Sequence, residues 1–304
     1  MRARISGCFV LFSLCLAVAA GAQQLPRPDH IVIVIEENKA YTDVMGSSAA
    51  PYINSLPARG ALMTNYTGLH HPSQPNYLEL FSGNEQGVCT DTCPTAASIK
   101  APNLAASLLA ASRTFVGFAE NLPDPVTCGP TSQQYARKHC PWLDFAGIPK
   151  SASQKFTAFP TTAAGFAKLP TVAIVIPDLF DDMHSAKTSG GNPVTKEVAQ
   201  GDAWLKSHLD AYATWAATHN SLLIITWDED SSNYPTPTSC KNGINTTPPA
   251  NRIPTIILGQ HVVAGSTSAA AYSHYNLLRT IEDMYGLTPI GGSANVSSIA
   301  GIWN

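Results

Sequence analysis

Five short apolar runs constrain the fold of this chain more than any other feature of its sequence. They are rich in β-branched residues, and they occupy residues 30–35 (HIVIVI), 114–119 (TFVGFA), 171–176 (TVAIVI), 221–227 (SLLIITW) and 254–258 (PTIIL). Nearly continuous apolar runs of this length are typical of strands that are buried on both faces of a parallel sheet. We therefore expect a mainly parallel sheet that is covered on both sides.

Helical patterns lie between these runs. Apolar residues recur at three- and four-residue steps in residues 103–112 (NLAASLLAAS), from about 195 to 217, and in 274–286 (HYNLLRTIEDMYG). The alternation of strand and helix indicates an α/β fold in which helices sandwich a mainly parallel central sheet. Ligands of such folds bind at the carboxyl ends of the strands, so a functional site is expected there.

The first 22 residues have the layout of a cleaved secretory signal. Arg2 and Arg4 precede an apolar run that ends in small residues at Ala20 and Ala22. No later stretch has the roughly 18 uninterrupted apolar residues that a membrane-spanning helix needs. We therefore expect residues 1–22 to be a signal peptide, cleaved near Ala22, and the mature protein to be secreted or periplasmic in a bacterium, without a stable membrane anchor.

The mature chain, residues 23–304, is expected to form a single catalytic domain. It has no Gly/Ser linker, charge block or internal repeat that would mark a boundary, and its length fits one large domain. The whole chain has 18 Lys+Arg and 21 Asp+Glu, for a formal net charge of −3. Neither nucleic acid nor an anionic membrane surface is an expected partner of a thinly charged, slightly acidic protein.

Five of the seven cysteines lie outside the signal segment. In an oxidising compartment, close spacing favours one disulfide between Cys89 and Cys93 and another between Cys128 and Cys140, which leaves Cys240 unpaired, although connectivity does not follow from sequence. The alternative is a cysteine-ligated metal or a thiol nucleophile. The chain has no CxxC motif, so structural disulfides are the favoured interpretation.

Acidic residues follow four of the five apolar runs. The segments are Glu36-Glu37-Asn38, Glu120-Asn121, Asp178 with Asp181-Asp182, and Asp228-Glu229-Asp230. Carboxylates are also common where strands enter solvent, but four clusters at one end of one sheet favour a functional site. Carboxylates that lie close together repel one another unless protons or a metal ion neutralise them, so the clusters predict a divalent metal ion whose identity stays open.

Ser73 lies between two prolines in the segment HHPSQPNYLELFSG, residues 70–83. Pro75 suits the first turn of a helix, which we expect to cover residues 76–82 and to end at Gly83. Ser73 would then precede a helix N-terminus, where free backbone N–H groups favour an anion. Its hydroxyl is either a nucleophile for a phosphoryl group or a buried turn serine.

Three histidines and one asparagine are candidates for contacts with a phosphate group. His184 follows an acidic strand end and His274 begins a helix. Their place in the ordered set of motifs described below favours a catalytic role for both, as phosphate contacts or as the acid that protonates the leaving group. His71 and Asn76 are predicted to bind substrate because they flank Ser73 in sequence. Asn76 has an alternative role as a support for the turn, and a single histidine often makes only structural hydrogen bonds.

An ordered set of motifs carries a family resemblance. IEENKAY, HPSQPNYLELFSG, PDLFDDMHS, IITWDED and SHYNLLRTIEDMYG occur in this order between about residues 30 and 286. The set resembles the bacterial phosphoesterase family, which contains secreted acid phosphatases and phospholipases C and is a branch of the alkaline phosphatase superfamily. The resemblance implies an alkaline-phosphatase-like fold.

The resemblance also implies roles for individual residues. Glu37 and Asn38 match a pair that binds a metal ion together with an acidic pair after a later strand, here Asp228 and Glu229. Ser73 matches the serine nucleophile, which is also a metal ligand. Glu229 stands where some acid phosphatases of the family have a second aspartate. Glu36 and Asp230 are expected beside these ligands.

The predicted function is that of a secreted, metal-dependent acid phosphatase that hydrolyses phosphate monoesters of small molecules through a phosphoserine. Metal coordination would favour the alkoxide of Ser73 and neutralise the phosphoryl oxygens. One alternative is a phosphodiesterase of the phospholipase C type, and a less favoured one is an inactive binding protein on the same fold. The presence of Ser73, Glu37 and Asp228 argues against the inactive protein.

Overall fold

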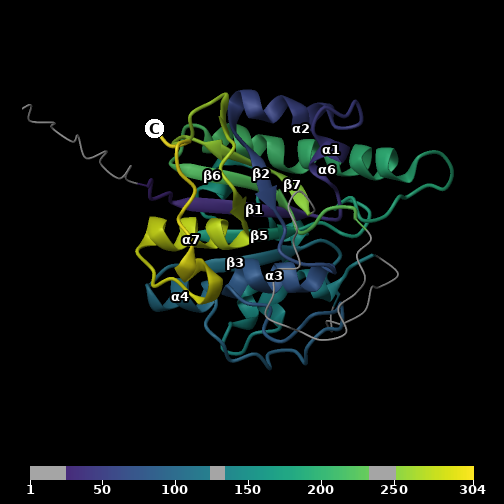
Figure 1. Cartoon of the computed structure of the whole chain (residues 1–304). Helices are drawn as coiled ribbons and strands as arrows, with labels where there is room; N and C mark the ends of the chain where they lie inside the picture. Colours follow the sequence, from purple (N-terminus) through teal and green to yellow (C-terminus); the bar gives the residue numbers. More distant parts are fainter. Residues whose placement is uncertain (1–24, 124–133, 233–250) are drawn as a thin grey trace, which may run out of the picture.

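The computed structural model describes residues 25–123, 134–232 and 251–304. Its centre is a nine-stranded sheet with the order β4-β3-β5-β1-β6-β7-β2-β8, and β9 also pairs with β2 (Figure 1). The strands are β1 (His30–Glu36), β2 (Gly60–Thr67), β3 (Phe115–Ala119), β4 (Ser153–Lys155), β5 (Val172–Ile176), β6 (Ser221–Trp227), β7 (Arg252–Gly259), β8 (Ser266–Ser268) and β9 (Tyr272–Ser273).

The sheet is mixed, so the expectation of a mainly parallel sheet holds only in part. Strand β1 pairs in parallel with β5 and β6, and β3 pairs in parallel with β4 and β5. Strand β7 runs antiparallel to both β6 and β2. The run at 254–258 is a buried strand, as predicted, but its composition does not encode its direction, because a strand buried on both faces has the same pattern in either orientation.

Strand β2 was not predicted. It carries the polar pair Thr64-Asn65, and Asn65 is exposed while the first four residues of the strand are buried. This mixture gives neither a continuous apolar run nor a regular alternation, so it lacks the usual strand signal. Its position is set by its pairing with β7 on one side and with β8 and β9 on the other.

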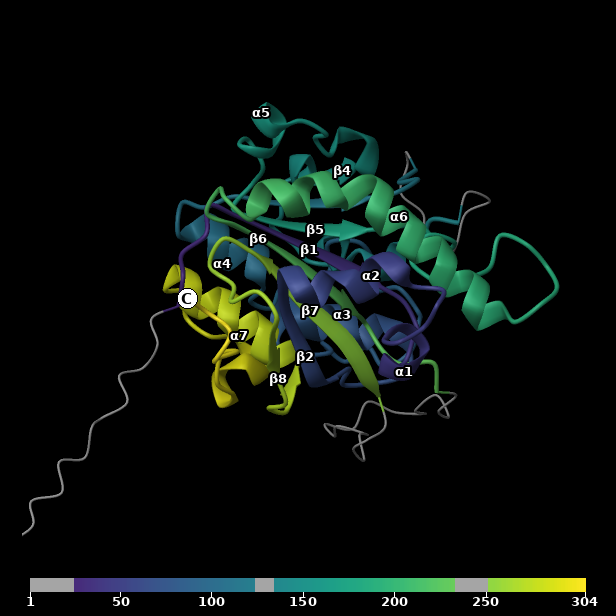
Figure 2. The ribbon, with the colours of Figure 1, turned by 90° about the horizontal axis from the view of Figure 1, so that it is seen from above.

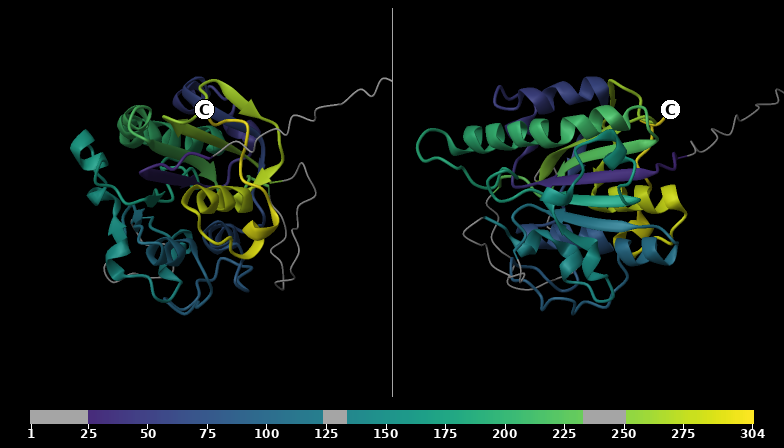
Figure 3. Two further views of the ribbon diagram at one scale, coloured as in Figure 1. Left: turned by 90° about the vertical axis from the view of Figure 1, so that its left-hand side faces the viewer. Right: turned by 180° about the vertical axis from the view of Figure 1, so that it is seen from behind.

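Helices cover both faces of the sheet (Figures 2 and 3). Helices α1, α2 and α6 lie on one face, and α3, α4 and α7 lie on the other. Their bounds are α1 (Tyr41–Val44), α2 (Pro51–Ser55), α3 (Ser73–Ser82), α4 (Leu104–Ala110), α5 (Ala163–Phe166), α6 (Pro193–Ala216) and α7 (His274–Tyr285), with 3-10 helices η1 (Leu56–Arg59), η2 (Arg137–His139), η3 (Pro141–Leu143), η4 (Lys150–Ala152), η5 (Phe156–Ala158) and η6 (Gly291–Asn295).

The three long helices expected from apolar periodicity are confirmed as α4, α6 and α7. The side chain of Asn103 caps α4 by accepting from the Ala106 N–H at 2.9 Å. Helix α7 ends at Gly286, whose φ of +65° closes the last turn in the left-handed region that glycine favours. The described part of the chain contains no helix both long and apolar enough to cross a bilayer.

The core lies where the predicted strands meet the helices. Residues 31–35 of β1 are at most 1% exposed, and all five residues of β5 and all seven of β6 are buried. Burial of these side chains on both faces of the sheet stabilises the fold by roughly 25 cal/mol per Å² of apolar surface removed from water. The prediction that these strands are buried on both faces is confirmed.

The cysteine prediction is wrong at one of its two pairs. Cys140 is a free thiol that is completely buried in the hydrophobic core, where burial raises the pKa of its thiol. The proposed bridge between Cys140 and Cys128 is therefore not formed, since short spacing in sequence does not bring a core thiol to a partner. Cys89 and Cys93 are both disulfide-bonded. Cys128, Cys240 and the signal segment 1–22 lie outside the described residues.

The buried carboxyl of Glu282, on α7, is expected to make the stability of the folded protein depend on pH. Burial raises the pKa of this carboxyl to about 7, although the Ser293 hydroxyl and the Ile290 N–H both donate to it. The folded state therefore favours the protonated acid, so stability is highest below the unfolded pKa and falls as the pH rises through 7. Glu282→Gln should raise Tm more at pH 8 than at pH 5, by roughly 2–5 °C, in thermal melts at both values. An equal effect at both values would contradict the prediction.

Candidate active site

The ends of β1, β5 and β6 bring three acidic segments together at one edge of the sheet. These strands are neighbours and run in parallel, so their carboxyl ends meet. The Glu37 N–H donates to the Asp182 carbonyl at 2.6 Å, and the Asp228 N–H donates to the Glu36 carbonyl at 3.0 Å. Backbone hydrogen bonds therefore fix the three segments relative to one another before any side chain contributes.

Helix α3 delivers Ser73 to this edge. The helix begins at Ser73 itself, three residues earlier than expected, so Pro75 lies within its first turn, where a missing N–H is tolerated. It ends at Gly83, as expected, with a φ of +70°. Ser73 is 1% exposed and every residue of α3 is buried. The helix is thus a rigid support for one serine hydroxyl.

Asn76 holds the turn that precedes α3. Its side-chain oxygen accepts from the backbone N–H groups of Leu69 and His70 at 2.8 and 2.9 Å. Its amide nitrogen donates to the carbonyls of His70 and Pro72 at 2.9 and 3.4 Å. Both ends of the side chain are thus bound to the turn, which favours its alternative role as a support, and the contact with substrate stays a prediction.

The hydroxyl of Ser73 lies between two carboxylates. Its Oγ is 3.0 Å from Glu37 Oε2 and 3.1 Å from Glu229 Oε1. A hydroxyl carries one hydrogen and can donate to only one of these oxygens at a time. The second close contact therefore requires a proton on a carboxyl or a cation nearby. This contact joins the elements that follow β1, β2 and β6.

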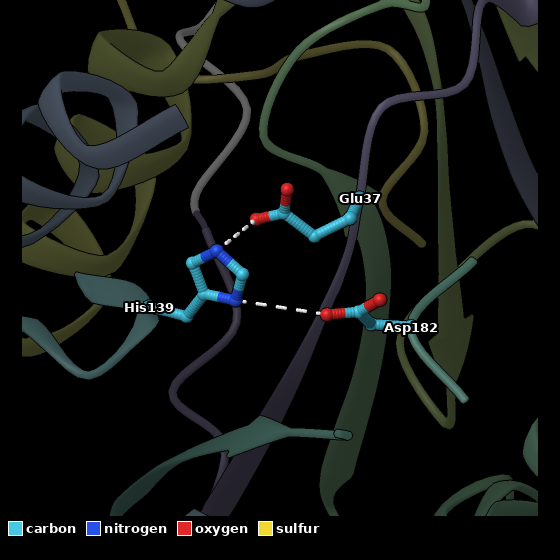
Figure 4. Close-up of side chains that lie close together, drawn as sticks. All are labelled: Glu37, His139 and Asp182. Atoms are coloured by element: carbon cyan, nitrogen blue, oxygen red, sulfur yellow. Dashed lines mark ion pairs between the residues drawn. The ribbon is translucent and has the colours of Figure 1, made fainter. Parts of the chain in front are cut away.

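His139 and Tyr77 complete the surroundings of Glu37. The Tyr77 hydroxyl donates to Glu37 Oε1, and the imidazole of His139 lies between Glu37 and Asp182, with Nε2 3.1 Å from Glu37 Oε1 and Nδ1 3.6 Å from Asp182 Oδ2 (Figure 4). The rings of His139 and Tyr77 stack with centroids 4.9 Å apart. His139 is 1% exposed, and burial lowers the pKa of its imidazole well below the ordinary value.

Sequence reasoning did not find the roles of His139 and Tyr77. His139 lies on the 3-10 helix η2, which follows no predicted strand, and only the fold brings it to the strand ends. One signal was present, because Arg137, Lys138 and His139 form a run of three basic residues in a chain with 13% charged residues. Asp182 belongs to the acidic segment that follows the apolar run at 171–176, but nothing in the sequence distinguishes it from Asp178 and Asp181.

Negative charge accumulates at the site. Burial, followed by the charge of Glu37, raises the pKa of Asp228 and of Asp182 well above the ordinary value, and the same two causes raise the pKa of Glu229 to about 9. Lys138 of η2 is also affected by this charge: burial lowers the pKa of its amine, but the negative charges of Glu37 and Asp91 outweigh burial and raise it. Its amine also donates to Asp91 at 2.6 Å. One amine does not balance four carboxylates.

The side chains present fit a hard divalent cation. Among the described residues, Asn38 Oδ1, Asp182 Oδ2 and Asp228 Oδ2 are buried oxygens without a hydrogen-bond partner. Ligand atoms of Glu37, His139 and Asp182 lie within 4.8 Å of one another. Buried oxygens that lack donors are costly unless a cation is near, and carboxylate and amide oxygens suit such an ion. The predicted ligands Glu37, Asn38, Ser73, Asp228 and Glu229 all lie at this edge.

The backbone places Asn38 for such a role. Its φ of +49° lies in the left-handed region, which asparagine adopts more readily than most residues. Its N–H donates to Asp228 Oδ1 at 3.1 Å, which leaves Asp228 Oδ2 free of that contact. The turn after β1 therefore holds the backbone of Asn38 against the carboxylate of Asp228.

The predicted histidines have three different environments. His71 Nδ1 is 2.7 Å from Glu229 Oε2, and burial lowers the pKa of His71. His184 is half-buried and follows Asp182, whose Oδ1 accepts from the His184 N–H at 2.8 Å. The His184 imidazole contacts the Ser185 hydroxyl at 3.0 Å. His71 therefore touches the group that holds Ser73, while His184 lies next to it through Asp182.

His274 is held by the protein at both ring nitrogens, and its catalytic role stays a prediction. It is 1% exposed, and its Nε2 lies 2.8 Å from the Asp228 carbonyl, which can only accept, so Nε2 carries the hydrogen. Its Nδ1 then accepts from the Tyr66 hydroxyl at 3.3 Å. Burial lowers the pKa of His274 to about 4. Both nitrogens of this neutral ring are used by the protein, so the ring fixes the backbone of Asp228.

A pocket of about 350 Å³ opens onto these groups. Asn38, His71 and Glu229 line it, together with Lys39, Pro72, Val194, Glu197, Asp230, Ser231 and Ser232. It is smaller than the pocket of about 680 Å³ that Glu120 lines, and Glu229 connects it to the hydroxyl of Ser73. The site combines a buried hydroxyl, a set of oxygen ligands and an opening for a small polar group.

Comparisons with known proteins agree with this arrangement. The sequence profile of the Phosphoesterase family matches residues 47–288. A phosphatidylinositol-3-phosphatase of Mycobacterium tuberculosis is 43% identical over 286 residues, which cover 94% of this chain and 86% of that protein. An acid phosphatase of Aspergillus fumigatus is 25% identical, and the match covers 84% of this chain but 54% of the fungal protein.

The fold is shared with solved structures at low sequence identity. A protein in the alkaline phosphatase superfamily from Vibrio parahaemolyticus superposes with a TM-score of 0.59 at 12% identity, and the match covers 91% of this chain and 72% of that chain. Identity at this level supports the architecture and not a shared substrate.

Proposed function

The chain belongs to the Phosphoesterase family and is a hydrolase of phosphate esters, and from this premise we propose that it is a secreted, metal-dependent phosphomonoesterase with Ser73 as its nucleophile. The observation that carries the proposal is the position of Ser73 Oγ, 3.0 Å from Glu37 and 3.1 Å from Glu229. A buried serine held by two carboxylates at the rim of a polar pocket has few purely structural explanations, since a cap or turn serine would bond the backbone.

The residues that would hold the metal ion are Glu37, Asn38, Asp228 and Glu229, together with the Ser73 hydroxyl. The buried, unpartnered oxygens of Asn38 and Asp228 support this assignment. When bound, a divalent cation would favour the deprotonated serine and neutralise charge on the phosphoryl oxygens. His139 and Tyr77 would fix the orientation of Glu37, as partners of a ligand do in other metal sites.

The proposed reaction has two steps. The Ser73 Oγ forms a bond to phosphorus, the bond from phosphorus to the ester oxygen breaks, and the Ser73 proton passes to one of its two carboxylate neighbours. Water then attacks the phosphoserine, which releases inorganic phosphate and returns the hydroxyl. Lys138 and His184 flank the carboxylates and are the side chains that would stabilise phosphoryl oxygens or protonate the leaving alcohol.

The relatives favour a monoester over a diester as the substrate. The M. tuberculosis relative is named as a phosphatase of a phosphoinositide, and the fungal relatives are named as acid phosphatases. These names support a phosphate monoester on an alcohol for this chain, whether soluble or part of a lipid head group. The bonded state of Cys89 and Cys93, with the expected signal segment, supports an oxidising compartment outside the cytoplasm.

The test is hydrolysis of p-nitrophenyl phosphate, its choline phosphodiester analogue and phosphatidylinositol 3-phosphate in vesicles. Each substrate is assayed across acid to alkaline pH, before and after chelation and with single divalent metals added back. We expect a strong preference for the monoesters, loss of activity on chelation and recovery with one metal. Preference for the choline diester would replace the proposal with a phospholipase C activity, and full activity after exhaustive chelation would exclude metal dependence.

His139→Gln tests whether the imidazole positions the site. The variant removes the contact with Asp182 and the stacking on Tyr77, so Glu37 should lose its fixed orientation. We expect kcat/KM for p-nitrophenyl phosphate to fall roughly 10- to 100-fold, with a weaker apparent affinity for the activating metal. His219→Gln, at an exposed histidine, is the control. An unchanged metal titration for His139→Gln would contradict the role.

A further inference from the structure

A second acidic cluster lies on the opposite face of the same strand ends. Glu36 is the last residue of β1, and Glu37 follows it directly. Glu37 contacts Tyr77 of α3, on one face. After burial, the charges that most raise the pKa of Glu36 are those of Asp181 and Glu120, and Asp202 of α6 also contributes. Glu36 is therefore close enough to Asp181 and Glu120 for their charges to act on it.

The residues after β5 also contact both sides of the sheet. Asp182 turns toward His139, whereas the residues just before it lie against α6: the Phe180 carbonyl accepts from Gln200 Nε2 at 2.8 Å, and Gly201 has no side chain to displace the Asp181 carbonyl. The loops that build the proposed active site therefore also build a separate group of carboxylates behind it.

Three carboxylates converge in this group. Ligand atoms of Glu120, Asp178 and Asp181 lie within 4.8 Å of one another. Glu120 follows β3 and accepts from the Asp178 N–H at 3.1 Å. Asp178 Oδ1 accepts from the N–H groups of Phe180 and Asp181 at 2.9 and 3.1 Å, and Asp178 Oδ2 accepts from the side-chain amide of Asn121 at 2.7 Å. These bonds fix the carboxylates in place. Lys187 pairs with Asp181 at 2.5 Å, which offsets one of the charges.

Glu36 is an independent sign of a missing partner. Its side chain is 0% exposed, and neither carboxylate oxygen has a hydrogen-bond partner in the described parts of the chain. A buried carboxylate without donors destabilises the fold unless it is protonated or a cation is near. Hydrogen bonds within the neighbouring cluster do not relieve this cost, because they do not reach Glu36.

The cluster is accessible to ions from solvent. Glu120 lines a pocket of about 680 Å³ on the α6 side, whose other walls include Asn121, Lys155 and the aromatic rings of Phe156 and Phe159. An ion can therefore reach Glu120 without passing through the opening beside Ser73. The chemistry of the donors, which are all oxygens, suits a hard divalent cation that takes carboxylates, carbonyls and water.

We propose that Glu120, Asp178 and Asp181 bind a second divalent cation of the calcium type, with the buried carboxylate of Glu36 facing it from β1. The cation would tie the loops after β3 and β5 to the end of β1. Because Glu36-Glu37 and Asp181-Asp182 are consecutive pairs, it would also fix the backbone that positions the active-site ligands. Its role is structural, and it stands apart from the metal of the proposed function.

The test measures binding of Ca²⁺ alone to the full chain after chelation, by isothermal titration calorimetry and by thermal melts. Glu120→Gln keeps the size and polarity of the side chain and removes one charge. We expect saturating Ca²⁺ to raise Tm of the wild type by roughly 4 °C, and Glu120→Gln to lose most of that rise and to bind one ion fewer. Without Ca²⁺, the variant should melt at the same temperature as the wild type or higher, because like charges no longer repel.

Two further variants separate this site from the active site. Asp228→Asn should lose the catalytic metal and keep the Ca²⁺-dependent rise in Tm, whereas Glu120→Gln should keep its turnover of p-nitrophenyl phosphate when the activating metal is saturating. Asp283→Asn, on the far side of α7, is the control for the loss of an acidic charge. Asp178→Asn repeats the test if Glu120→Gln does not fold.

The proposal is overturned if Glu120→Gln and Asp178→Asn bind as much Ca²⁺ as the wild type. It is also overturned if the wild type binds no Ca²⁺ beyond the ion that Asp228→Asn removes, since the carboxylates would then be neutralised by protons. Failure of the proposed function would appear elsewhere, as turnover that survives in Ser73→Ala, so the two conclusions fail independently.

Discussion

Replacement of Ser73 by alanine is expected to reduce turnover of p-nitrophenyl phosphate by at least about 10³-fold, because the variant has no atom that can form the phosphoserine. Folding should be preserved. The hydroxyl lies between Glu37 and Glu229, and Glu37 keeps its contacts with Tyr77 and His139 when the hydroxyl is removed. The measurements are kcat in a chromogenic assay and Tm in a thermal melt.

The same helix provides the control for Ser73→Ala. Ser82 is the last residue of α3 and is also buried, but its hydroxyl donates to the Leu78 carbonyl at 2.8 Å and has no contact with the acidic residues. Ser82→Ala should therefore retain full turnover with a small loss of stability, on the order of 1 kcal/mol. If Ser73→Ala were as active as Ser82→Ala, Ser73 would not be the nucleophile.

Asp228→Asn should lower both the bound metal and the rate, the latter by about 10²-fold or more. The substitution keeps the volume of the side chain and an oxygen that accepts from the Asn38 N–H. It converts the unpartnered Oδ2 into an amide and removes the negative charge that a cation would need. Metal content is measured by elemental analysis of the purified protein, and the rate is measured with added metal up to saturation.

The thermal stability of Asp228→Asn shows whether a lower rate comes from loss of the metal or from damage to the fold. Burial raises the pKa of Asp228 well above its ordinary value, so an uncharged amide should be tolerated without the metal. We expect the chelated variant to be at least as stable as the chelated wild type, with Asp283→Asn again as the control. A variant with normal metal content and normal rate would show that the ion, if any, binds elsewhere.

Much of the fold could be predicted because it follows from local patterns. The runs that became β1, β3, β5, β6 and β7 are short and continuously apolar, and α4, α6 and α7 carry the periodicity and end signals of helices. The order of strands in the sheet could not be predicted in this way. Strand β2 lacks the usual strand signal because its second half contains polar residues. The antiparallel direction of β7 has no signature in its composition.

For the candidate site, too, the sequence predicted which residues would be near one another but not what each side chain would contact. Glu37, Ser73, Asp228 and Glu229 each stand next to a recognisable element, either a strand end or a helix start, so sequence position alone suggested that they would meet. Asn76 and His274 also stand beside such elements, but their side chains are used to fix the backbone of the turn before α3 and of Asp228. Proximity in sequence gives no information on which way a side chain points.

Local sequence patterns were sufficient to predict the class of fold, the edge of the sheet where the candidate site lies, and the hydroxyl and carboxylates expected there. Two features depend on the packing of distant segments: His139, from a short 3-10 helix, lies between Glu37 and Asp182, and Cys140 is a buried free thiol. The physical reason is range: periodicity and capping act within a few residues, whereas these contacts join segments up to about a hundred residues apart, so packing alone selects them.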